Sequence, residues 1–175
     1  MFIFADSSMI SSSSLADLLD KTIDLAATDY DLKKEYDFKL IQIIREYQDD
    51  LPMVPCEAGK IQQVLLNIFR NGAQAMQEAG TRRPKFIVRT RFDRESHRAC
   101  MEIQDNGPGM DEETRKRIFE PFFTTKPVGV GTGLGMSVSY FIIKENHGGD
   151  MQVESRPGEG SKFIICLPVE RRTGS

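Results

Sequence analysis

The sequence has few residues of the kinds that build disulfide frameworks and metal centres. It contains three cysteines and two histidines among 175 residues. Cys56, Cys100 and Cys166 are far apart, odd in number and without Cys-x-x-Cys spacing, so we expect reduced, mostly buried thiols and no structural zinc. His97 and His147 offer little material for a metal site built on imidazole.

Long apolar runs and a strong excess of one charge are also absent. No run approaches the roughly 18 residues of a membrane-spanning helix, and the opening residues MFIFADSS lack the basic flank of a secretory signal. The 26 acidic and 23 basic residues leave a formal charge of −3, which gives no electrostatic case for nucleic acid as a partner. We therefore expect a cytoplasmic chain that contacts neither membrane nor nucleic acid.

The order of the expected elements indicates an α+β fold. The length suits one domain, and we expect a flexible lead or junction at 1–14, the domain at 15–170 and a tail at 171–175. Hydrophobic spacing predicts helices at 14–27, 60–80, 111–120 and 136–149, strands at 37–47 and as a pair within 85–105, an irregular connector at 51–59, and a closing hairpin at 150–168. This order predicts a two-layer α/β sandwich, in which helices cover one face of a single mixed, mostly antiparallel sheet.

The 60–80 helix carries two asparagines that suggest a binding site. Asn67 and Asn71 are four residues apart, so their side chains share one face of the helix. That face must lie near the apolar stripe, where an unpaired amide costs about 1–3 kcal/mol. The two residues are therefore either satisfied core amides, or Asn71 offers its carbonyl oxygen to a hard cation such as Mg²⁺.

Two glycine-rich segments suggest where an anion and a base would bind. The segment 129–135, GVGTGLG, precedes a helix and could let the backbone approach a phosphate. It is neither a Walker A loop nor a dinucleotide fingerprint, because it lacks GxxxxGK[ST] and does not follow a strand. A flexible surface loop is the remaining alternative. The segment 105–110, DNGPGM, follows an alternating strand and by itself also fits an ordinary turn.

The order of four motifs resembles the ATP-binding domain of the histidine kinases. NIFRN, DNGPGM, FEPFFTTK and GTGLGMSVSYFIIKENHGG follow one another, and the resemblance covers residues 15–168. Histidine kinases share this superfamily with type II topoisomerases, mismatch-repair ATPases and heat-shock chaperones. The resemblance implies the Bergerat-type ATP-binding fold, with ATP and Mg²⁺ as cofactors.

The resemblance also implies roles for single residues. Asp105 would accept a hydrogen bond from the adenine amino group, and Asn71 would hold Mg²⁺. Lys126 is the candidate for the terminal phosphate, with a solvated loop lysine as an equal alternative. The implied nucleotide contacts are Asn71, Asp105, Gly107, Gly109, Met110, Phe122, Thr125, Lys126, Gly131, Thr132, Gly133, Leu134 and Gly135. The implied catalytic residues are Asn67, Asn71 and Lys126.

Three further positions bear on the resemblance. The phenylalanines of FEPFF look like the family's aromatic box, which anchors one end of a mobile lid. His147, at the end of the last helix, is expected to be structural. Gln74 departs from relatives that carry a basic residue facing the phosphates, which leaves open which side chain contacts the γ-phosphate. The box residues are Phe119, Phe122 and Phe123.

One position favours phosphoryl transfer over hydrolysis. In the ATPase branches of the superfamily a glutamate stands one helical turn before the metal-binding asparagine and acts as the general base, whereas this chain has Asn67. A neutral amide cannot take a proton from water near neutral pH, while phosphoryl transfer needs mainly positioning and charge neutralisation. The resemblance therefore implies a protein histidine kinase of two-component signal transduction.

The acceptor histidine is expected outside this chain. Neither His97 nor His147 lies in a His-Glu-x-x-x-Pro context. The resemblance places the acceptor on a separate dimerisation domain, which would pass the phosphate to the receiver domain of a response regulator. We therefore expect nucleotide binding with little or no autophosphorylation by the isolated chain.

Two other functions of the same fold remain open. One is a stand-alone serine kinase of the anti-sigma type, which the aromatic box and the long first helix fit less well. The other is a non-catalytic interaction domain, against which the intact Asn71, Asp105 and glycine-rich segment argue. Phosphoserine on a partner protein would indicate the first, and failure to bind ATP the second.

Overall fold

The chain folds around a five-stranded sheet, in a computed structural model that describes residues 10–28, 37–126 and 133–170. The strand order is β2–β4–β5–β7–β6. β2 runs parallel to β4, and every other pair of neighbours is antiparallel. The predicted mixed, mostly antiparallel sheet is therefore confirmed. In spatial order the strands are Gln42–Tyr47, Lys85–Asp93, Arg98–Asp105, Ser161–Pro168 and Asp150–Ser155.

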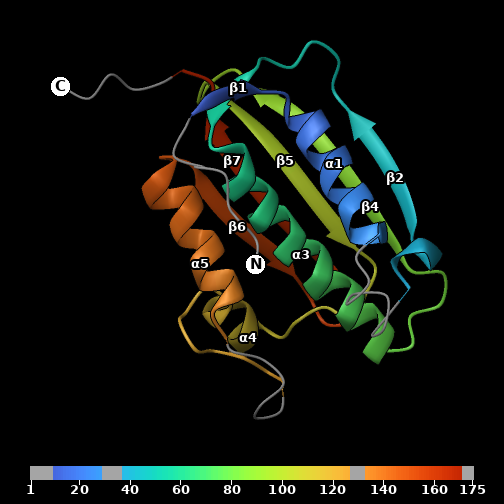
Figure 1. Ribbon diagram of the computed structural model, residues 1–175. Helices are drawn as coiled ribbons and strands as arrows, with labels where there is room; N and C mark the ends of the chain where they lie inside the picture. Colours follow the sequence, from blue (N-terminus) through green and yellow to red (C-terminus); the bar gives the residue numbers. More distant parts are fainter. Residues whose placement is uncertain (1–9, 29–36, 127–132, 171–175) are drawn as a thin grey trace.

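Three helices cover one face of this sheet, as the two-layer prediction requires (Figure 1). α3, Ala58–Glu78, lies in the middle and contacts both α1, Leu15–Thr28, and α5, Gly135–Phe141. α5 continues as a π-helical turn, Ile142–Asn146, and the short α4, Glu112–Arg117, lies below it in the view of Figure 1. None of the helices in the described residues is long and apolar enough to cross a membrane.

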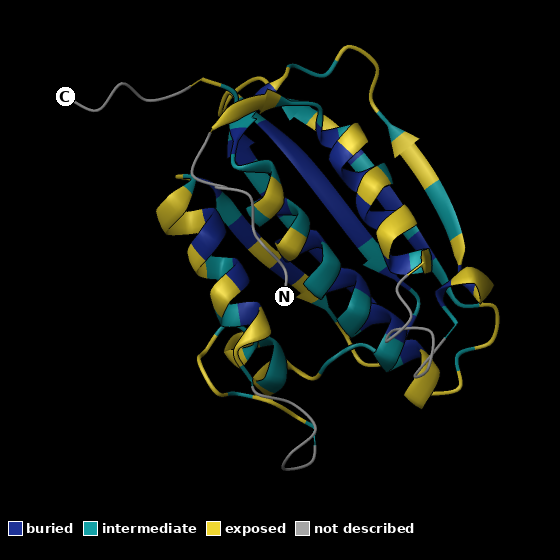
Figure 2. Ribbon diagram, viewed as in Figure 1, coloured by how far each residue is buried: buried dark blue, intermediate teal, exposed yellow. Residues whose placement is uncertain are grey.

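The core fills the space between α3 and the sheet. Ile61, Val64, Leu65 and Ile68 follow helical spacing and are at most 2% exposed, and Figure 2 shows the buried side of each helix turned toward the strands. Alternate strand residues meet this row, because successive side chains of a strand point to opposite faces. Within the part of the chain that the structure describes, no helix therefore covers the other face of the sheet.

An aromatic cluster closes the core near α1. Phe69 of α3 and Phe86 of β4 meet edge to face with ring centroids 5.1 Å apart. Phe38 stacks on Phe86 from the 3-10 turn Phe38–Leu40, where a strand had been expected. Asp37 caps this turn by accepting a hydrogen bond from Lys39 N–H. The predicted strand therefore begins only at Gln42.

The lead and the connector contain strands that hydrophobic spacing had not indicated. β1, Ser11–Ser13, pairs antiparallel with β3, Val54–Cys56. These strands have three residues each, which is too short for a periodic pattern to reveal. Ser14 caps the first helix, because its Oγ accepts a hydrogen bond from Asp17 N–H. The 111–120 helix was predicted too long, since α4 ends at Arg117.

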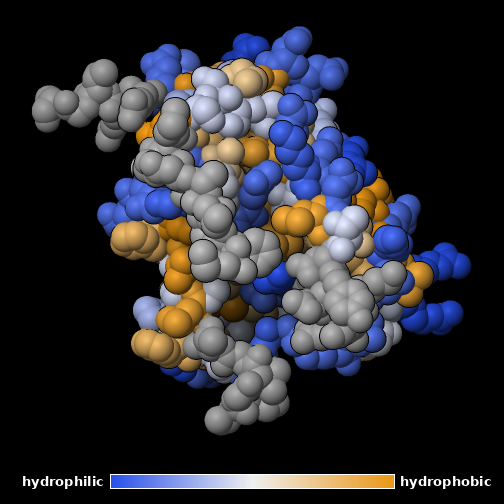
Figure 3. Space-filling model, in the orientation of Figure 1, coloured by the Kyte–Doolittle hydropathy of each residue, from blue (hydrophilic) through white to orange (hydrophobic). Residues whose placement is uncertain are grey.

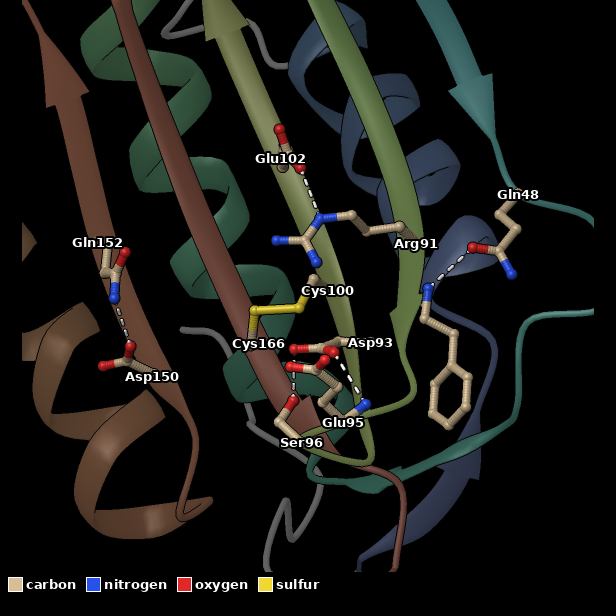
Figure 4. The surroundings of a disulfide bond; sticks show 11 residues. Gln48, Arg91, Asp93, Glu95, Ser96, Cys100, Glu102, Asp150, Gln152 and Cys166 are labelled. Atoms are coloured by element: carbon tan, nitrogen blue, oxygen red, sulfur yellow. Dashed lines mark hydrogen bonds and ion pairs between the residues drawn. A yellow bond between two sulfur atoms is a disulfide. The ribbon is translucent and has the colours of Figure 1, made fainter.

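The expectation that all three cysteines are reduced is wrong for two of them. Cys100 and Cys166 form a disulfide between β5 and β7 (Figure 4). They are 66 residues apart in sequence, but the antiparallel register places them directly opposite each other. Cys56 is a free, buried thiol. Sequence distance was therefore a poor guide, because strand register decides which cysteines meet.

Candidate functional site

A cleft of about 680 Å³ opens between the C-terminal half of α3, the loop after β5, α4 and the start of α5. Its described lining residues are Asn71, Gln74, Ala75, Glu78, Ala79, Pro108, Gly109, Met110, Thr114, Ile118, Phe123, Thr124, Thr125, Lys126, Gly133, Gly135 and Met136. A second cleft of similar volume lies beside the β6–β7 hairpin, but neither Asn71 nor any described residue of 123–136 lines it. The first cleft is therefore where the predicted segments converge.

Asp105 is the last residue of β5 and lies shortly before the residues 108–110 that line the cleft. Its side chain is buried, and its Oδ1 accepts hydrogen bonds from Gly107 N–H at 2.9 Å and Ser161 N–H at 3.3 Å. Both bonds that the described residues donate to this carboxylate end on Oδ1, so Oδ2 remains for a donor on a ligand. Burial raises the pKa of Asp105, and the two N–H donors oppose this only in part.

The loop that follows β5, residues 106–110 (the Asp105 loop), is packed against the turn of the β6–β7 hairpin. Gly109 has a φ of +70°, and a Cβ there would collide with the carbonyl oxygen of Arg156. Gly160 has a φ of +74°, and a Cβ there would collide with the carbonyl oxygen of Asp105. Both positions therefore require glycine for close approach as well as for conformation.

Two serines of this hairpin belong to the site and were missed from the sequence. Ser155 Oγ accepts a hydrogen bond from Met110 N–H at 2.8 Å and lies 2.8 Å from Ser161 Oγ. Ser161 in turn donates its N–H to Asp105. The sequence predicted only a closing hairpin at 150–168, which gave these serines no role. The available signal was the segment 158–161, GEGS, in which a polar residue follows two glycines.

The two asparagines of α3 do different things. Asn71 is half-buried and lines the cleft. Asn67 lies one turn earlier, and its Nδ2 donates to Ser139 Oγ at 3.2 Å and more weakly to the Gly135 carbonyl at 3.4 Å. Asn67 thus ties α3 to the start of α5, which makes it a satisfied amide, whereas Asn71 is the one that faces the cleft.

The aromatic segment anchors the chain on both sides of residues 127–132. Phe119 stacks on Tyr140 of α5 with ring centroids 4.9 Å apart, and Phe123 lies under the Arg117 guanidinium, 4.6 Å from the ring centroid. Phe122 N–H donates to the Gly133 carbonyl at 3.0 Å. This bond holds the chain before residues 127–132 against the chain that follows them, at the rim of the cleft.

The structure brings most of the predicted nucleotide contacts together. Asn71, Gly109, Met110, Thr125, Lys126, Gly133 and Gly135 line the cleft. Asp105 and Gly107 lie buried behind the loop that forms its wall. Phe122 is 74% exposed and Leu134 is 37% exposed, and neither lines the cleft. Gly131 and Thr132 lie outside the described residues.

Two flanking residues are engaged within the protein. The His147 ring joins the end of the π-helical turn to the start of α3: its Nε2 accepts from Glu57 N–H at 3.1 Å, which leaves Nδ1–H to donate to the Ile142 carbonyl at 2.8 Å. The structural role expected for His147 is confirmed. Gln74 lines the cleft and donates to Glu78 Oε1 at 3.2 Å.

The cleft suits a metal ion that takes most of its ligands from water and a bound phosphate, and few from the protein. No group of three or more His, Cys, Asp or Glu side chains in the described residues could hold a metal ion. The cleft instead offers the Asn71 amide and the half-buried Lys126. Mg²⁺ commonly keeps water and phosphate oxygens as most of its ligands and needs few from the protein, so the residues present fit magnesium bound together with a polyphosphate.

Comparisons with known proteins point to one family. The family model described as histidine kinase-, DNA gyrase B-, and HSP90-like ATPase matches residues 56–171. Sporulation kinase E of Bacillus subtilis (strain 168) is 37% identical over 150 residues, which are 86% of this chain and 18% of the relative. The signal transduction histidine-protein kinase AtoS of Escherichia coli (strain K12) is 40% identical over 129 residues, which are 74% of this chain and 20% of the relative.

A solved structure supports the same grouping. The catalytic domain of histidine kinase ThkA superposes with a TM-score of 0.73 at 28% identity, covering 92% of this chain and 96% of that one. The match therefore extends over the whole of that catalytic domain. The chain spans only about a fifth of the length of the two curated relatives.

Proposed function

The chain belongs to the family of histidine kinase-, DNA gyrase B- and HSP90-like ATPases, and from this premise we propose that it is the ATP-binding catalytic domain of a sensor histidine kinase. It binds ATP with Mg²⁺ and donates the γ-phosphate to a histidine on a separate dimerisation domain. The observation that carries this proposal is the convergence of Asn71, the Asp105 loop, Lys126 and the start of α5 on one cleft.

Asp105 would recognise the adenine end of the nucleotide. Its Oδ1 is occupied by two backbone donors, so Oδ2 would accept the hydrogen bond of the adenine amino group. A bond to an ionised acceptor in a buried site contributes about 1.5–3 kcal/mol. The carboxylate therefore gives both affinity and a preference for a base that carries a donor at this position.

Asn71, Lys126 and the backbone at Gly133 and Gly135 would hold the phosphate end. The chemistry that Mg²⁺ would supply there is neutralisation of the phosphate charge. The Asn71 amide oxygen would be its ligand from the protein. The Lys126 ammonium, half-buried at the rim, would balance the charge of the terminal phosphate.

The cleft favours transfer over hydrolysis. Asn67 stands where a general base would be needed, and its amide is already bonded to α5. Among the described lining residues the one carboxylate is Glu78. It lies two helical turns beyond Asn71, about 10 Å along the axis. No carboxylate of the described lining residues is therefore adjacent to Asn71 to activate a water molecule.

The two histidines of the chain support an acceptor on another domain. His147 uses both ring nitrogens within the fold. His97 lies before β5, at the end of that strand opposite to Asp105, and a strand of this length spans roughly 23 Å. The positions of the two imidazoles therefore support an acceptor on a histidine-bearing domain that docks beside the cleft.

An apolar face next to the phosphate end suits this docking. Val138 and Phe141 of α5 are 40% and 56% exposed, and Phe122 at the rim is 74% exposed. Figure 3 shows hydrophobic atoms gathered over α5. Exposed apolar groups that cluster beside a cleft mark interaction surfaces. The dimerisation domain would cover this face and afterwards pass the phosphate to a response regulator, in the cytoplasm where ATP is available.

A calorimetric titration with ATP, with and without Mg²⁺, tests the proposal. Asp105→Asn should weaken binding by about tenfold or more, while Asn71→Ala should remove mainly the Mg²⁺ dependence. Asp111→Asn, in the same loop region, and Gln77→Ala, on the exposed side of α3, are the matched controls and should bind as the unmutated chain does. Absence of ATP binding by the unmutated chain would overturn the proposal.

A transfer assay distinguishes the acceptor. With the parent's dimerisation domain supplied in trans, the product should be acid-labile phosphohistidine. Acid-stable phosphoserine on a partner protein would instead favour a serine kinase of the same fold. The isolated chain should show little or no label.

A further inference from the structure

A row of four side chains crosses the outer face of the sheet. The strand registers pair Arg91 with Cys100, Cys100 with Cys166, and Cys166 with Asp150. The neighbours Ala99 and Met101 point into the core, so the row lies on the opposite face, which no helix of the described residues covers. Figure 4 shows the disulfide in the middle of this polar surface.

The two sulfur atoms differ in access. Cys100 is fully buried, whereas Cys166 is half-buried and lines a surface depression of about 360 Å³ together with Arg91, Arg98 and Asp150. A small oxidant or thiol can therefore reach Cys166 from solvent. The Arg91 guanidinium, which lies opposite Cys100 in the strand register, is paired with the Glu102 carboxylate at 2.9 Å. Solvent access therefore makes Cys166 the sulfur that an oxidant reaches first.

The disulfide joins the two strands that complete the nucleotide pocket. β5 ends at Asp105 and β7 begins at Ser161, and Ser161 N–H donates to Asp105 Oδ1. Oxidation therefore links the strands at one end of their ladder, while the pocket depends on their alignment at the other.

We propose that Cys100 and Cys166 form a reversible thiol–disulfide site whose oxidation state alters the affinity of the cleft for adenine nucleotides. This inference rests on the proposed function in one respect, because a compartment that supplies ATP to a kinase also keeps most thiols reduced. Disulfides that form in such a compartment are usually transient and redox-sensing.

The chemistry involves two electrons and can be written with hydrogen peroxide as the oxidant. The Cys166 thiolate attacks the peroxide, giving a sulfenic acid and releasing hydroxide, which takes up a proton to form water. The Cys100 thiolate then attacks the Cys166 sulfur and expels the second hydroxide. Two thiols and one peroxide thus give one disulfide and two waters. A dithiol reverses the change by attacking the accessible Cys166 sulfur, with Cys100 as the leaving thiolate.

Cys56 differs from Cys100 and Cys166 in its expected reactivity toward peroxide. It is fully buried, and burial raises the pKa of its thiol. A neutral thiol without solvent access reacts slowly. The site therefore predicts that two of the three cysteines respond to peroxide and that the third does not.

The test compares the full chain in its two oxidation states. Peroxide should remove two of the three titratable thiols and two hydrogen masses, and dithiothreitol should restore both. Cys56→Ser should show the same loss of two thiols, whereas Cys100→Ala/Cys166→Ala should show none. Peroxide that leaves all three thiols free, or a disulfide that dithiothreitol cannot reduce, overturns the site.

Titration of ATP into each state tests the coupling. The disulfide state should bind about fivefold more tightly, a change at the lower end of typical coupling between sites. The Cys100→Ala/Cys166→Ala variant should bind equally under both conditions, which controls for effects of peroxide elsewhere. Equal affinities in the unmutated chain overturn the coupling. If neither state binds ATP, the kinase proposal fails, while the thiol count still reports on the redox site.

Discussion

The side-chain amide of Asn67 donates to Ser139 Oγ over 3.2 Å and thereby fixes α5 against α3. Ser139 is fully buried, and its hydroxyl in turn donates to the Gly135 carbonyl at 2.8 Å. Gly135 lines the cleft. A residue selected from the sequence as catalytic thus acts, within the described structure, by holding in place the backbone at the phosphate end.

Ser139→Ala should therefore weaken both stability and nucleotide binding. Loss of one buried hydrogen-bond network member lowers the free energy of unfolding by about 1 kcal/mol, and a less constrained Gly135 should reduce ATP affinity by a few-fold. Denaturant unfolding and calorimetric titration measure the two effects. Ser137→Ala, which removes an exposed hydroxyl on the same helix, should change neither, and an equal loss in both variants would contradict the role assigned to Ser139.

The buried carboxylate of Asp105 should leave a signature in stability against pH. Burial raises its pKa above the ordinary 3.8, so between 3.8 and the raised pKa the native state holds a proton that the unfolded chain has released. The free energy of unfolding therefore loses a contribution as pH rises through this window. Asp105→Asn removes that loss, and the variant should gain stability relative to the unmutated chain from pH 3 to pH 7.

Asp111 is the control of opposite sign. Its carboxylate accepts a hydrogen bond from Thr114 N–H at the start of α4, which lowers its pKa. Ionised Asp111 therefore stabilises the fold above the ordinary pKa and ceases to do so as pH falls. Asp111→Asn removes this contribution, so its stability relative to the unmutated chain should fall as pH rises toward 3.8, in a window below the one in which Asp105→Asn gains stability. Parallel curves for the two variants would contradict this assignment.

Substitution of Gly109 and of Gly158 can distinguish the cost of a steric clash from the cost of a left-handed backbone conformation. Both have positive φ, but a Cβ on Gly109 would collide with Arg156, whereas nothing lies within 4 Å of one on Gly158. Alanine at either position costs about 1–2 kcal/mol for the left-handed conformation. Gly109→Ala should cost more than this and should also abolish ATP binding, whereas Gly158→Ala should bind normally. Thermal unfolding and ATP titration of the pair make the comparison.

The apolar face of α5 should matter for transfer and not for nucleotide binding. Val138→Ser/Phe141→Ser should reduce phosphorylation of the dimerisation domain by about tenfold, as for loss of an interface hot spot, with an unchanged ATP affinity. Leu25→Ser, an equally exposed apolar residue on α1, is the control. Unchanged transfer in the double variant would place the docking surface elsewhere.

Reduction of the disulfide should lower global stability. The bond closes a loop with a sequence separation of 66, for which loop-closure entropy predicts a contribution of about 4 kcal/mol. Urea unfolding with and without dithiothreitol measures the difference. The Cys100→Ala/Cys166→Ala variant should unfold at the same urea concentration under both conditions, and a similar shift in that variant would show that the reductant acts elsewhere.

The sequence predicted those parts of the fold that local pattern determines. The apolar stripe of α3 and the alternation in β4 and β5 were long enough to identify the elements and their buried faces, so the two-layer fold followed. The three-residue strands β1 and β3 were missed because pairing with each other, rather than local periodicity, defines them. The 3-10 turn at Phe38 was missed because its aromatic packing against Phe69 and Phe86 is a tertiary effect.

The convergence of the motifs on one cleft could be predicted for the same reason. Asn71 and Gly109, which line the cleft, belong to short contiguous motifs that can be recognised in the sequence. Ser155 and Ser161 were not, because their role depends on a hairpin that returns to the Asp105 loop across about 50 residues of chain. The Cys100–Cys166 pair was misjudged in the same way, since register is a property of the assembled sheet.

The β6–β7 hairpin sets an order of events during synthesis on the ribosome. Asp105 lacks its Ser161 donor until β7 has emerged, about 60 residues after β5, an interval of roughly 3–12 s at ordinary elongation rates. A nascent chain halted in this interval has α3 and β5 but an open pocket wall beside Gly109. ATP should therefore stabilise such a partial chain less than a polypeptide in which β7 has left the exit tunnel.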